Sequence, residues 1–223
     1  HFSGIANITG QSFGGLMASG LLNVVGEHMN GLQIAGIANI TASKLNGVQV
    51  ALCNYATKAR GLQIGLVNYY KEDMKGFQLG LVNANPDTKV QMMVYGGNAT
   101  PANIGVRFKN QLFYTILGVG SMYQGLNDKF SASASYRAGL SFPLYKGLSI
   151  SGDLGYQHIE AFDNKDEVIP KRLYALQARA NLEYQFTKKF GIFATGGYGV
   201  TRFYNKSSNY DKGAIIEAGI VLF

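Results

Sequence analysis

Several residue types that mark common protein classes are scarce in this chain of 223 residues. It has a single cysteine, Cys53, which excludes a disulfide framework and a metal site built on cysteines. Tryptophan is absent, and proline occurs four times. Charged residues make up only 15% of the chain, against about 25% in an average soluble domain. No apolar run reaches the roughly 18 residues that a membrane-spanning helix requires.

Glycine and the aromatic residues are abundant instead, with 29 glycines, 14 tyrosines and 13 phenylalanines. This composition indicates β-structure with one face turned toward an apolar environment. The net charge of +7 comes from scattered lysines and arginines, so we interpret it as a solvated surface and expect no binding of nucleic acid. The first residues already resemble a strand and no signal peptide precedes them, so we expect a mature chain or a trimmed fragment.

The first part of the chain is an internal repeat. Blocks of the type GLQIGLVN occur at 31–39, 47–54, 61–68 and 76–83, and weaker copies end at Asn7 and Asn23. The closing asparagines are 16, 16, 15, 14 and 15 residues apart, a period too short for helical repeats of about 33 residues or more. Within a copy, large apolar residues alternate with other residues, which predicts a strand. Two arrangements fit this period: a meander with one strand per copy, or a β-solenoid with one coil per copy.

The second part of the chain has longer alternating segments. Residues 130–142 place phenylalanine, alanine, tyrosine and leucine on one face and mainly serine on the other. Segments 148–157 and 173–186 show the same division, with tyrosines near their ends. The alternation predicts eight strands, near 213–223, 189–204, 172–186, 147–161, 130–143, 111–123, 102–109 and 88–97.

Strands of this length with a polar second face are typical of transmembrane β-barrels, because soluble sheets average about 5–6 residues per strand. The joints alternate between short ones, as at 109–110, 143–147 and 187–189, and longer polar ones at 124–129, 161–172 and 204–213. Short periplasmic turns and longer extracellular loops are usual in outer-membrane barrels.

We therefore predict an all-β fold, a transmembrane antiparallel up-and-down barrel of about 14 strands. Residues 1–87 would supply six repeat-derived strands and residues 88–223 the eight longer ones, within one barrel. An even strand number would leave both termini on the periplasmic side of a bacterial outer membrane. The alternative is an eight-stranded barrel preceded by a β-solenoid of about six coils, and the short repeat blocks favour this alternative.

The blocks GLQIGLVN (61–68) and GFQLGLVN (76–83) resemble the surface-repeat outer-membrane proteins of Bacteroides-type bacteria. The segment TKVQMMVYGGNATPANIGVRF (88–108) and the ending EAGIVLF (217–223) are similar to the barrel half of those proteins. The resemblance covers essentially the whole chain and implies fold class and location, but little about activity. It also gives Phe223 as a C-terminal insertion signal. Because Phe223 has the strand parity of Glu217, a local bulge or a frayed end is expected there.

Two sets of side chains are candidate functional residues. Parity directs six charges into the barrel, where they could pair across the interior or set the selectivity of a narrow channel: Arg107, Arg137, Arg179, Asp153, Glu183 and Glu217. The repeat places glutamines at equivalent positions, where a ladder of them could line the interior or contact sugar or protein: Gln33, Gln49, Gln63 and Gln78.

No catalytic, cofactor-binding or metal-binding constellation is evident. The three histidines do not occur at ligand spacing, and no G-x-S-x-G motif is present. A membrane hydrolase would need Ser133 and His158 to converge. We expect a non-enzymatic outer-membrane subunit of a secretion, uptake or barrel-insertion complex, in contact with lipid, lipopolysaccharide and other outer-membrane proteins. A narrow channel for small solutes is the alternative, followed by an outer-membrane enzyme.

Overall fold

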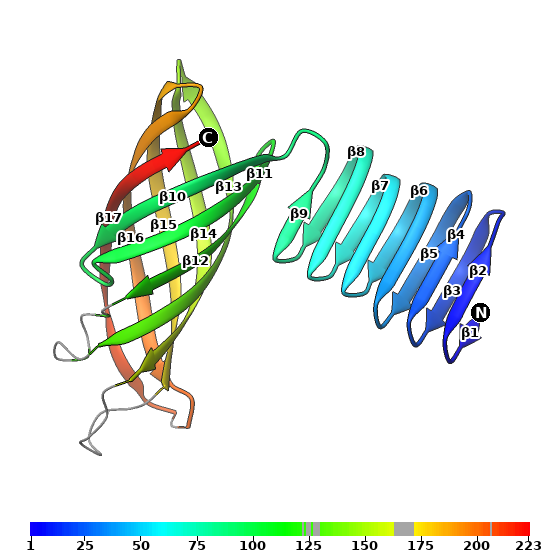
Figure 1. The fold of residues 1–223 in the computed structure, drawn as a ribbon, viewed down its shortest axis with the longest axis horizontal. Coiled ribbons are helices and arrows are strands. Elements are labelled where there is room, and N and C mark those ends of the chain that lie inside the picture. The colour runs from blue at the N-terminus through cyan, green and yellow to red at the C-terminus, as the bar shows by residue number, and fades with distance from the viewer. Residues whose placement is uncertain (122, 124–125, 127–129, 163–171, 206) are drawn as a thin grey trace. The chain divides into compact units, whose positions relative to one another are not determined.

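The computed structural model describes residues 1–223 except 122, 124–125, 127–129, 163–171 and 206. The chain forms two compact units, His1–Thr88 and Lys89–Phe223 (Figure 1). Among the described residues, no helix is long and apolar enough to cross a membrane.

The first unit is a β-solenoid in which every strand pair is parallel. Equivalent residues of successive copies face each other, so that Gln49 pairs with Gln33 on one side and with Gln63 on the other. Such pairing makes one coil per copy, with the copies stacked in chain order (Figure 1). Its strands are β1 (Phe2–Ser3), β2 (Ala6–Thr9), β3 (Phe13–Ser19), β4 (Leu22–Val25), β5 (His28–Ala35), β6 (Ala38–Val50), β7 (Cys53–Ile64), β8 (Val67–Leu79) and β9 (Val82–Ala84).

Each coil has two arms, one carrying the repeated glutamine and the other the repeated asparagine. A small core lies between the arms, formed by Met17, Val25, Met29, Leu45, Ala56 and Ala59. Five successive coils each have one glycine with a positive φ, as at Gly47, where φ is 140°. A Cβ atom on Gly47 would lie 1.9 Å from the carbonyl oxygen of Gly31, so both the backbone conformation and the close stacking of coils require glycine.

The second unit is a closed antiparallel barrel of eight strands in the part of the chain that the structure describes. Consecutive strands are neighbours, and β10 pairs with β17 to close the ring. The strands are β10 (Lys89–Gly97), β11 (Ala102–Asn110), β12 (Phe113–Ser121), β13 (Ser131–Tyr145), β14 (Leu148–Ala161), β15 (Arg172–Thr187), β16 (Phe190–Phe203) and β17 (Asn209–Leu222). Each lies close to a strand predicted from alternation.

The prediction of a single barrel of about 14 strands is wrong, and the alternative of a solenoid followed by an eight-stranded barrel is confirmed. Residues 1–87 do not supply barrel strands, because their copies pair in parallel with one another. An up-and-down barrel would need neighbouring copies to run in opposite directions. In a coil the chain turns twice per copy and returns to the same direction, which parallel pairing requires.

The two ends of the barrel differ in their connections. At one end, the tight turns after β11 and β13 contain Gln111 and Lys146, whose φ angles are 50° and 28°. Lys89, where the barrel begins, and Phe223, where it ends, lie at this short-turn end. The predicted longer joints at 124–129 and 161–172 fall largely outside the described residues.

Candidate functional site

The interior of the barrel is crossed by an ion pair between Arg107 on β11 and Glu183 on β15. Arg107 Nη1 donates to Glu183 Oε2 at 2.6 Å, and Arg107 Nη2 donates to Glu183 Oε1 at 3.0 Å. These strands are four apart in a ring of eight, so the pair joins opposite walls. Both side chains are buried, and Arg107 Nε also donates to Gln91 Oε1 at 2.6 Å.

A second group of buried charges lies beside this pair. Arg137 binds Asp153 on the neighbouring strand through two hydrogen bonds of 2.8 Å. Arg179 binds Glu217 through hydrogen bonds of 3.1 and 3.0 Å. Arg137 Nη1 lies 3.8 Å from Glu217 Oε2, which links the two pairs across the barrel. The structure thus joins all six predicted interior charges in ion pairs, three positive and three negative.

Uncharged polar groups complete this network, and the sequence pattern does not mark them as site residues. Tyr114 Oη and Asn181 Nδ2 both donate to Asp153 Oδ2, at 2.7 and 2.9 Å. Asn181 Oδ1 accepts from Arg137 at 3.1 Å and from Thr195 at 2.7 Å. The inward position of Asn181 follows from strand parity, but β12, which carries Tyr114, is apolar on both faces and gives no such signal.

Glycines on the strands next to the arginines leave room for the long arginine side chains. A Cβ atom on Gly155 would lie 3.1 Å from Arg137 Cγ and 3.2 Å from Arg179 Nη1. A Cβ atom on Gly197 would lie 3.1 Å from Arg179 Cγ. Glycines in these strands therefore let the long guanidinium side chains lie along the inner wall.

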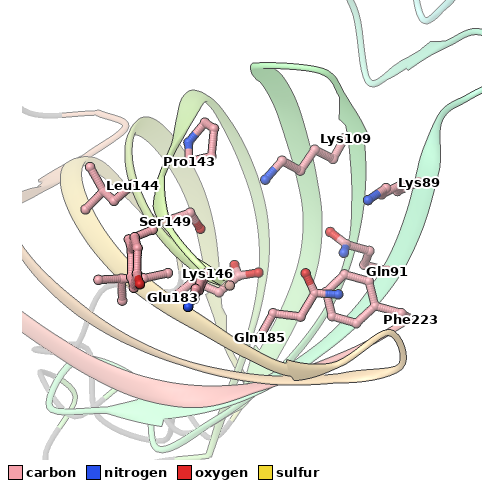
Figure 2. Close-up of a pocket in the computed structure, with 13 residues that line it drawn as sticks. Lys89, Gln91, Lys109, Pro143, Leu144, Lys146, Ser149, Glu183, Gln185 and Phe223 are labelled. Carbon is pink, nitrogen blue, oxygen red and sulfur yellow. The ribbon is translucent and has the colours of Figure 1, made fainter.

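Two recesses flank the charged layer. The one at the short-turn end has a volume of about 340 Å³ and is lined by residues that include Lys89, Gln91, Lys109 and Glu183 (Figure 2). The other, of about 440 Å³, is lined by residues that include Tyr123 and Gln177. Along β15, Gln177 lines one recess and Glu183 the other, while Arg179 and Asn181 lie between. The charged layer thus separates the two recesses.

The interior also contains apolar residues. Met93, Tyr95, Tyr114, Ile116, Phe193 and Val221 form a buried cluster, and Phe223 packs against it. The backbone N–H of Phe223 donates to the carbonyl of Lys189 at 3.1 Å, so the chain end is paired. The bulge or frayed end expected near Phe223 is wrong, because among the described residues the only register shift between β16 and β17 lies at Thr201/Arg202. Phe223 keeps the inward parity of Glu217.

In the repeat unit, the four predicted glutamines form a hydrogen-bonded ladder. Each Nε2 donates to the Oε1 of the preceding glutamine, at 2.9 Å from Gln49 to Gln33, 2.8 Å from Gln63 to Gln49 and 2.9 Å from Gln78 to Gln63. A parallel ladder connects the asparagines from Asn7 to Asn83. All four glutamines are buried, so the idea that they contact sugar or another protein is wrong. Their hydrogen bonds connect each coil to the next.

The residues suggested for a hydrolase do not converge. Ser133 is buried and accepts from Gln157 Nε2 at 2.8 Å inside the barrel. His158 lies on the outer face, where its Nδ1 is 2.7 Å from Tyr204 Oη. The two side chains are on opposite faces of the wall, because Ala134 rather than Ser133 pairs with His158. Within the described ranges, no group of three or more His, Cys, Asp or Glu side chains could hold a metal ion.

The outer face of the barrel has aromatic rings near both ends of its strands. At one end Tyr174 stacks with Tyr156 and contacts Tyr204, with ring centroids 6.1 and 5.0 Å apart. Burial and a hydrogen bond with Tyr156 raise the pKa of Tyr204 to about 12. At the other end Phe186 contacts Tyr184 and Phe190, at 4.8 and 5.9 Å. Exposed aliphatic residues lie between these groups, among them Leu154, Leu176 and Leu182.

Comparison with known proteins finds similar barrels among solved structures. The N-terminal β-barrel domain of Pseudomonas aeruginosa OprF is 16% identical, with a TM-score of 0.42, over 60% of this chain and 93% of that one. Neisserial surface protein A is 9% identical (TM-score 0.37; 60% and 92% covered), and the Yersinia pestis outer membrane protein Ail is 15% identical (0.38; 61% and 99%). No protein-family model and no curated protein sequence matches the chain.

Proposed function

We propose that this protein is an integral outer-membrane β-barrel protein without catalytic activity or cofactor. The observation that carries the membrane location is the apolar outer face between two sets of aromatic rings. Tyr174 and Tyr184 are ten residues apart on β15, which is about 33 Å along a strand and about 25 Å in height at a tilt of about 40°. That height is the thickness of the apolar band of outer-membrane barrels.

We propose further that the barrel acts as a structural or accessory subunit rather than as a pore. Three buried ion pairs, with the polar groups bound to them, occupy the layer between the two recesses. A conducting pore would need a continuous open path for solute, and the paired side chains occupy that space. The pairing of Arg107 with Glu183 across the barrel supports a rigid, closed interior.

The proposed partners are outer-membrane lipid, lipopolysaccharide and other outer-membrane proteins of a larger assembly for secretion, uptake or barrel insertion. The resemblance of the GLQIGLVN-type blocks to surface-repeat proteins of Bacteroides-type bacteria supports this setting. The barrel begins and ends at its short-turn end, and in outer-membrane barrels such turns are periplasmic. We therefore propose that Lys89 and Phe223 face the periplasm.

Native extraction in mild detergent followed by mass spectrometry tests the accessory role. We expect partner proteins at a fixed stoichiometry that persists through a second purification step. If the protein emerges alone from membranes of cells that express it natively, the accessory role is wrong. The membrane location is tested separately, since it requires only that the chain fractionates with the outer membrane.

A narrow channel for small solutes is the second candidate, because polar side chains line part of both recesses and only one charged layer separates them. Planar bilayer recordings decide between the two functions. The closed interior predicts no steady single-channel conductance from the purified protein. Regular conductance steps whose ion selectivity changes in an Arg107→Gln variant would support the channel instead.

A further inference from the structure

The exterior of the repeat unit is divided into an apolar edge and a charged edge. At one end of every coil, a small residue precedes an exposed aliphatic residue, and these aliphatic side chains are 38 to 69% exposed: Ile5, Leu21, Ile37, Leu52, Leu66 and Leu81. The outward positions next to this turn are also apolar, as at Ile64 and Val67 in one coil. We call this surface the apolar edge.

All charged side chains of the repeat unit lie away from the apolar edge. They cluster at the opposite turns of the coils, where Lys58 pairs with Glu72 at 3.2 Å, and in the segment that follows the last coil. The charged residues are Glu27, Lys44, Lys58, Arg60, Lys71, Glu72, Asp73, Lys75 and Asp87. A water-facing surface of this size would normally carry interspersed charges, so the complete division has to have a physical cause.

The height of the apolar edge is close to that of one lipid leaflet. From Leu62 to the turn residue Leu66 is four residues, which span at most about 13 Å. The hydrocarbon core of a bilayer is about 30 Å thick, so the edge reaches about half-way through. Six coils are separated by five intervals of about 4.8 Å, so the strip is about 24 Å long from the first coil to the last.

A pair of tyrosines marks the border on the asparagine-bearing arm. Tyr55 and Tyr69 occupy equivalent positions of neighbouring coils and stack with their ring centroids 5.8 Å apart. Thr57, two residues further along the chain from Tyr55, donates its hydroxyl to the carbonyl of Ala42 in the turn at the charged edge. Tyrosine is enriched where hydrocarbon meets water, because its ring is apolar and its hydroxyl is polar.

We propose that the repeat unit inserts its apolar edge into one leaflet of a lipid bilayer, with the charged edge in water. Lipid fits this surface better than a protein partner does, because the edge offers a smooth, repeated set of aliphatic side chains with no charged anchor. Insertion by one apolar face parallel to the membrane is how monotopic proteins bind. The inference rests on the proposed function in one respect, that the barrel brings this unit to a bilayer.

The single cysteine provides a direct test, because Cys53 is exposed and lies next to the turn residue Leu52. The full chain, labelled with bimane at Cys53, is reconstituted in phosphatidylcholine vesicles that carry a nitroxide either on the acyl chain or on the headgroup. Two matched variants in a Cys53→Ser background move the label. Ala42→Cys moves it to the charged edge, and Leu154→Cys moves it to the outer face of the barrel.

Insertion predicts stronger quenching of Cys53 and of Leu154→Cys by the acyl-chain nitroxide than by the headgroup nitroxide, and little acyl-chain quenching of Ala42→Cys. If Leu154→Cys is quenched but Cys53 is not, the inference is overturned while the barrel remains in the membrane. If Leu154→Cys is also unquenched, the membrane location itself fails. Equal quenching at all three positions would also overturn the inference, because the edge would then have no preference for lipid.

A charge placed on the apolar edge gives an independent check. Leu66 is exposed, so a Leu66→Glu variant keeps the core of the coil, and it should reduce acyl-chain quenching of the label at Cys53 on the neighbouring coil. Ala42→Glu adds the same charge at the opposite edge and should leave the quenching unchanged. Unchanged quenching in Leu66→Glu, or cross-linking of Cys53 to a co-purified protein without quenching, would favour a protein partner and overturn the inference.

Discussion

Arg107 and Glu183 are 76 residues apart in the chain and form a two-bond ion pair across the interior of the barrel. Removing one partner leaves the other charge buried and unpaired, which costs about 3–5 kcal/mol. Arg107→Gln should therefore lower the free energy of unfolding by an amount of this size. The measurement is the denaturant or temperature midpoint of unfolding of the barrel in detergent. Unfolding is monitored by the different gel mobilities of the folded and unfolded forms.

The double variant Arg107→Gln/Glu183→Gln serves as the control for this prediction. Because neither charge then remains buried, we expect it to recover most of the stability that the single variant loses. If the double variant loses as much stability as the Arg107→Gln and Glu183→Gln single variants added together, the pair is not coupled, and the closed interior loses its main support.

A charge on the outer face should report the depth of each residue in the membrane. Leu154 lies midway along β14, and an arginine at the bilayer midplane costs about 2–4 kcal/mol. Leu154→Arg should therefore reduce folding into lipid vesicles. Tyr184→Arg, in the aromatic set near the short-turn end of β15, should cost about 0–1 kcal/mol. Comparable effects at both positions would contradict a membrane-spanning barrel.

The positive φ of Gly47 predicts a localised weakness in the repeat unit. Gly47→Ala would impose both an unfavourable backbone conformation and a contact of 1.9 Å with Gly31, so we expect a loss of about 2 kcal/mol or more. Gly14→Ala is the matched control, because the nearest atom to its Cβ would be 4.0 Å away. Protease resistance of residues 1–88 within the full chain measures both, and equal resistance would disprove the prediction.

The hydrogen bonds of the glutamine ladder should contribute measurably to the stability of the repeat unit. Gln63→Ala removes two buried hydrogen bonds, one to Gln49 and one from Gln78, and a buried amide group without a partner costs about 1–3 kcal/mol. The exposed Gln11 provides the control, since Gln11→Ala should change stability by less than about 0.5 kcal/mol. A Gln63→Ala variant as stable as the control would show that the ladder is dispensable.

That Phe223 acts as an insertion signal remains a prediction, and the structure gives the location of the side chain. Its ring packs against the buried cluster around Val221 at the short-turn end. We expect Phe223→Ser to slow assembly of the barrel in cells more than it lowers the stability of the assembled form. The measurement is a pulse-chase of outer-membrane assembly alongside unfolding of the purified variant. Normal assembly kinetics would remove the role.

The barrel strands could be predicted from the sequence because few structures besides a long strand produce period-two alternation over ten or more residues. The same alternation misled the assignment of the repeat. In a coil, as in a barrel strand, Leu62 and Ile64 point outward while Gln63 points inward. What differs is the direction of the neighbouring copy, which depends on turn geometry at residues such as Gly47 and on the pairing of asparagines.

Side-chain pairing in the interior was only partly predictable. Parity directed Arg107 and Glu183 inward, but it could not specify that their strands lie on opposite walls, since that depends on the strand number. Eight strands bring β11 and β15 face to face, whereas fourteen would separate these walls by a wide lumen. The closed interior therefore follows from the strand number, which the repeat obscured.

The stacking of equivalent residues has a consequence for how this protein can vary. Each inner member of a ladder, such as Gln49, Gln63, Asn39 or Asn54, donates one amide hydrogen bond to a neighbouring coil and accepts one from the other neighbour. An inner copy could therefore be duplicated or deleted without leaving a mismatched neighbour. Each such event would change the length of the stack by about 4.8 Å and leave the barrel untouched. The length of the repeat unit can therefore change in steps of one coil, and homologous chains are expected to differ by whole coils.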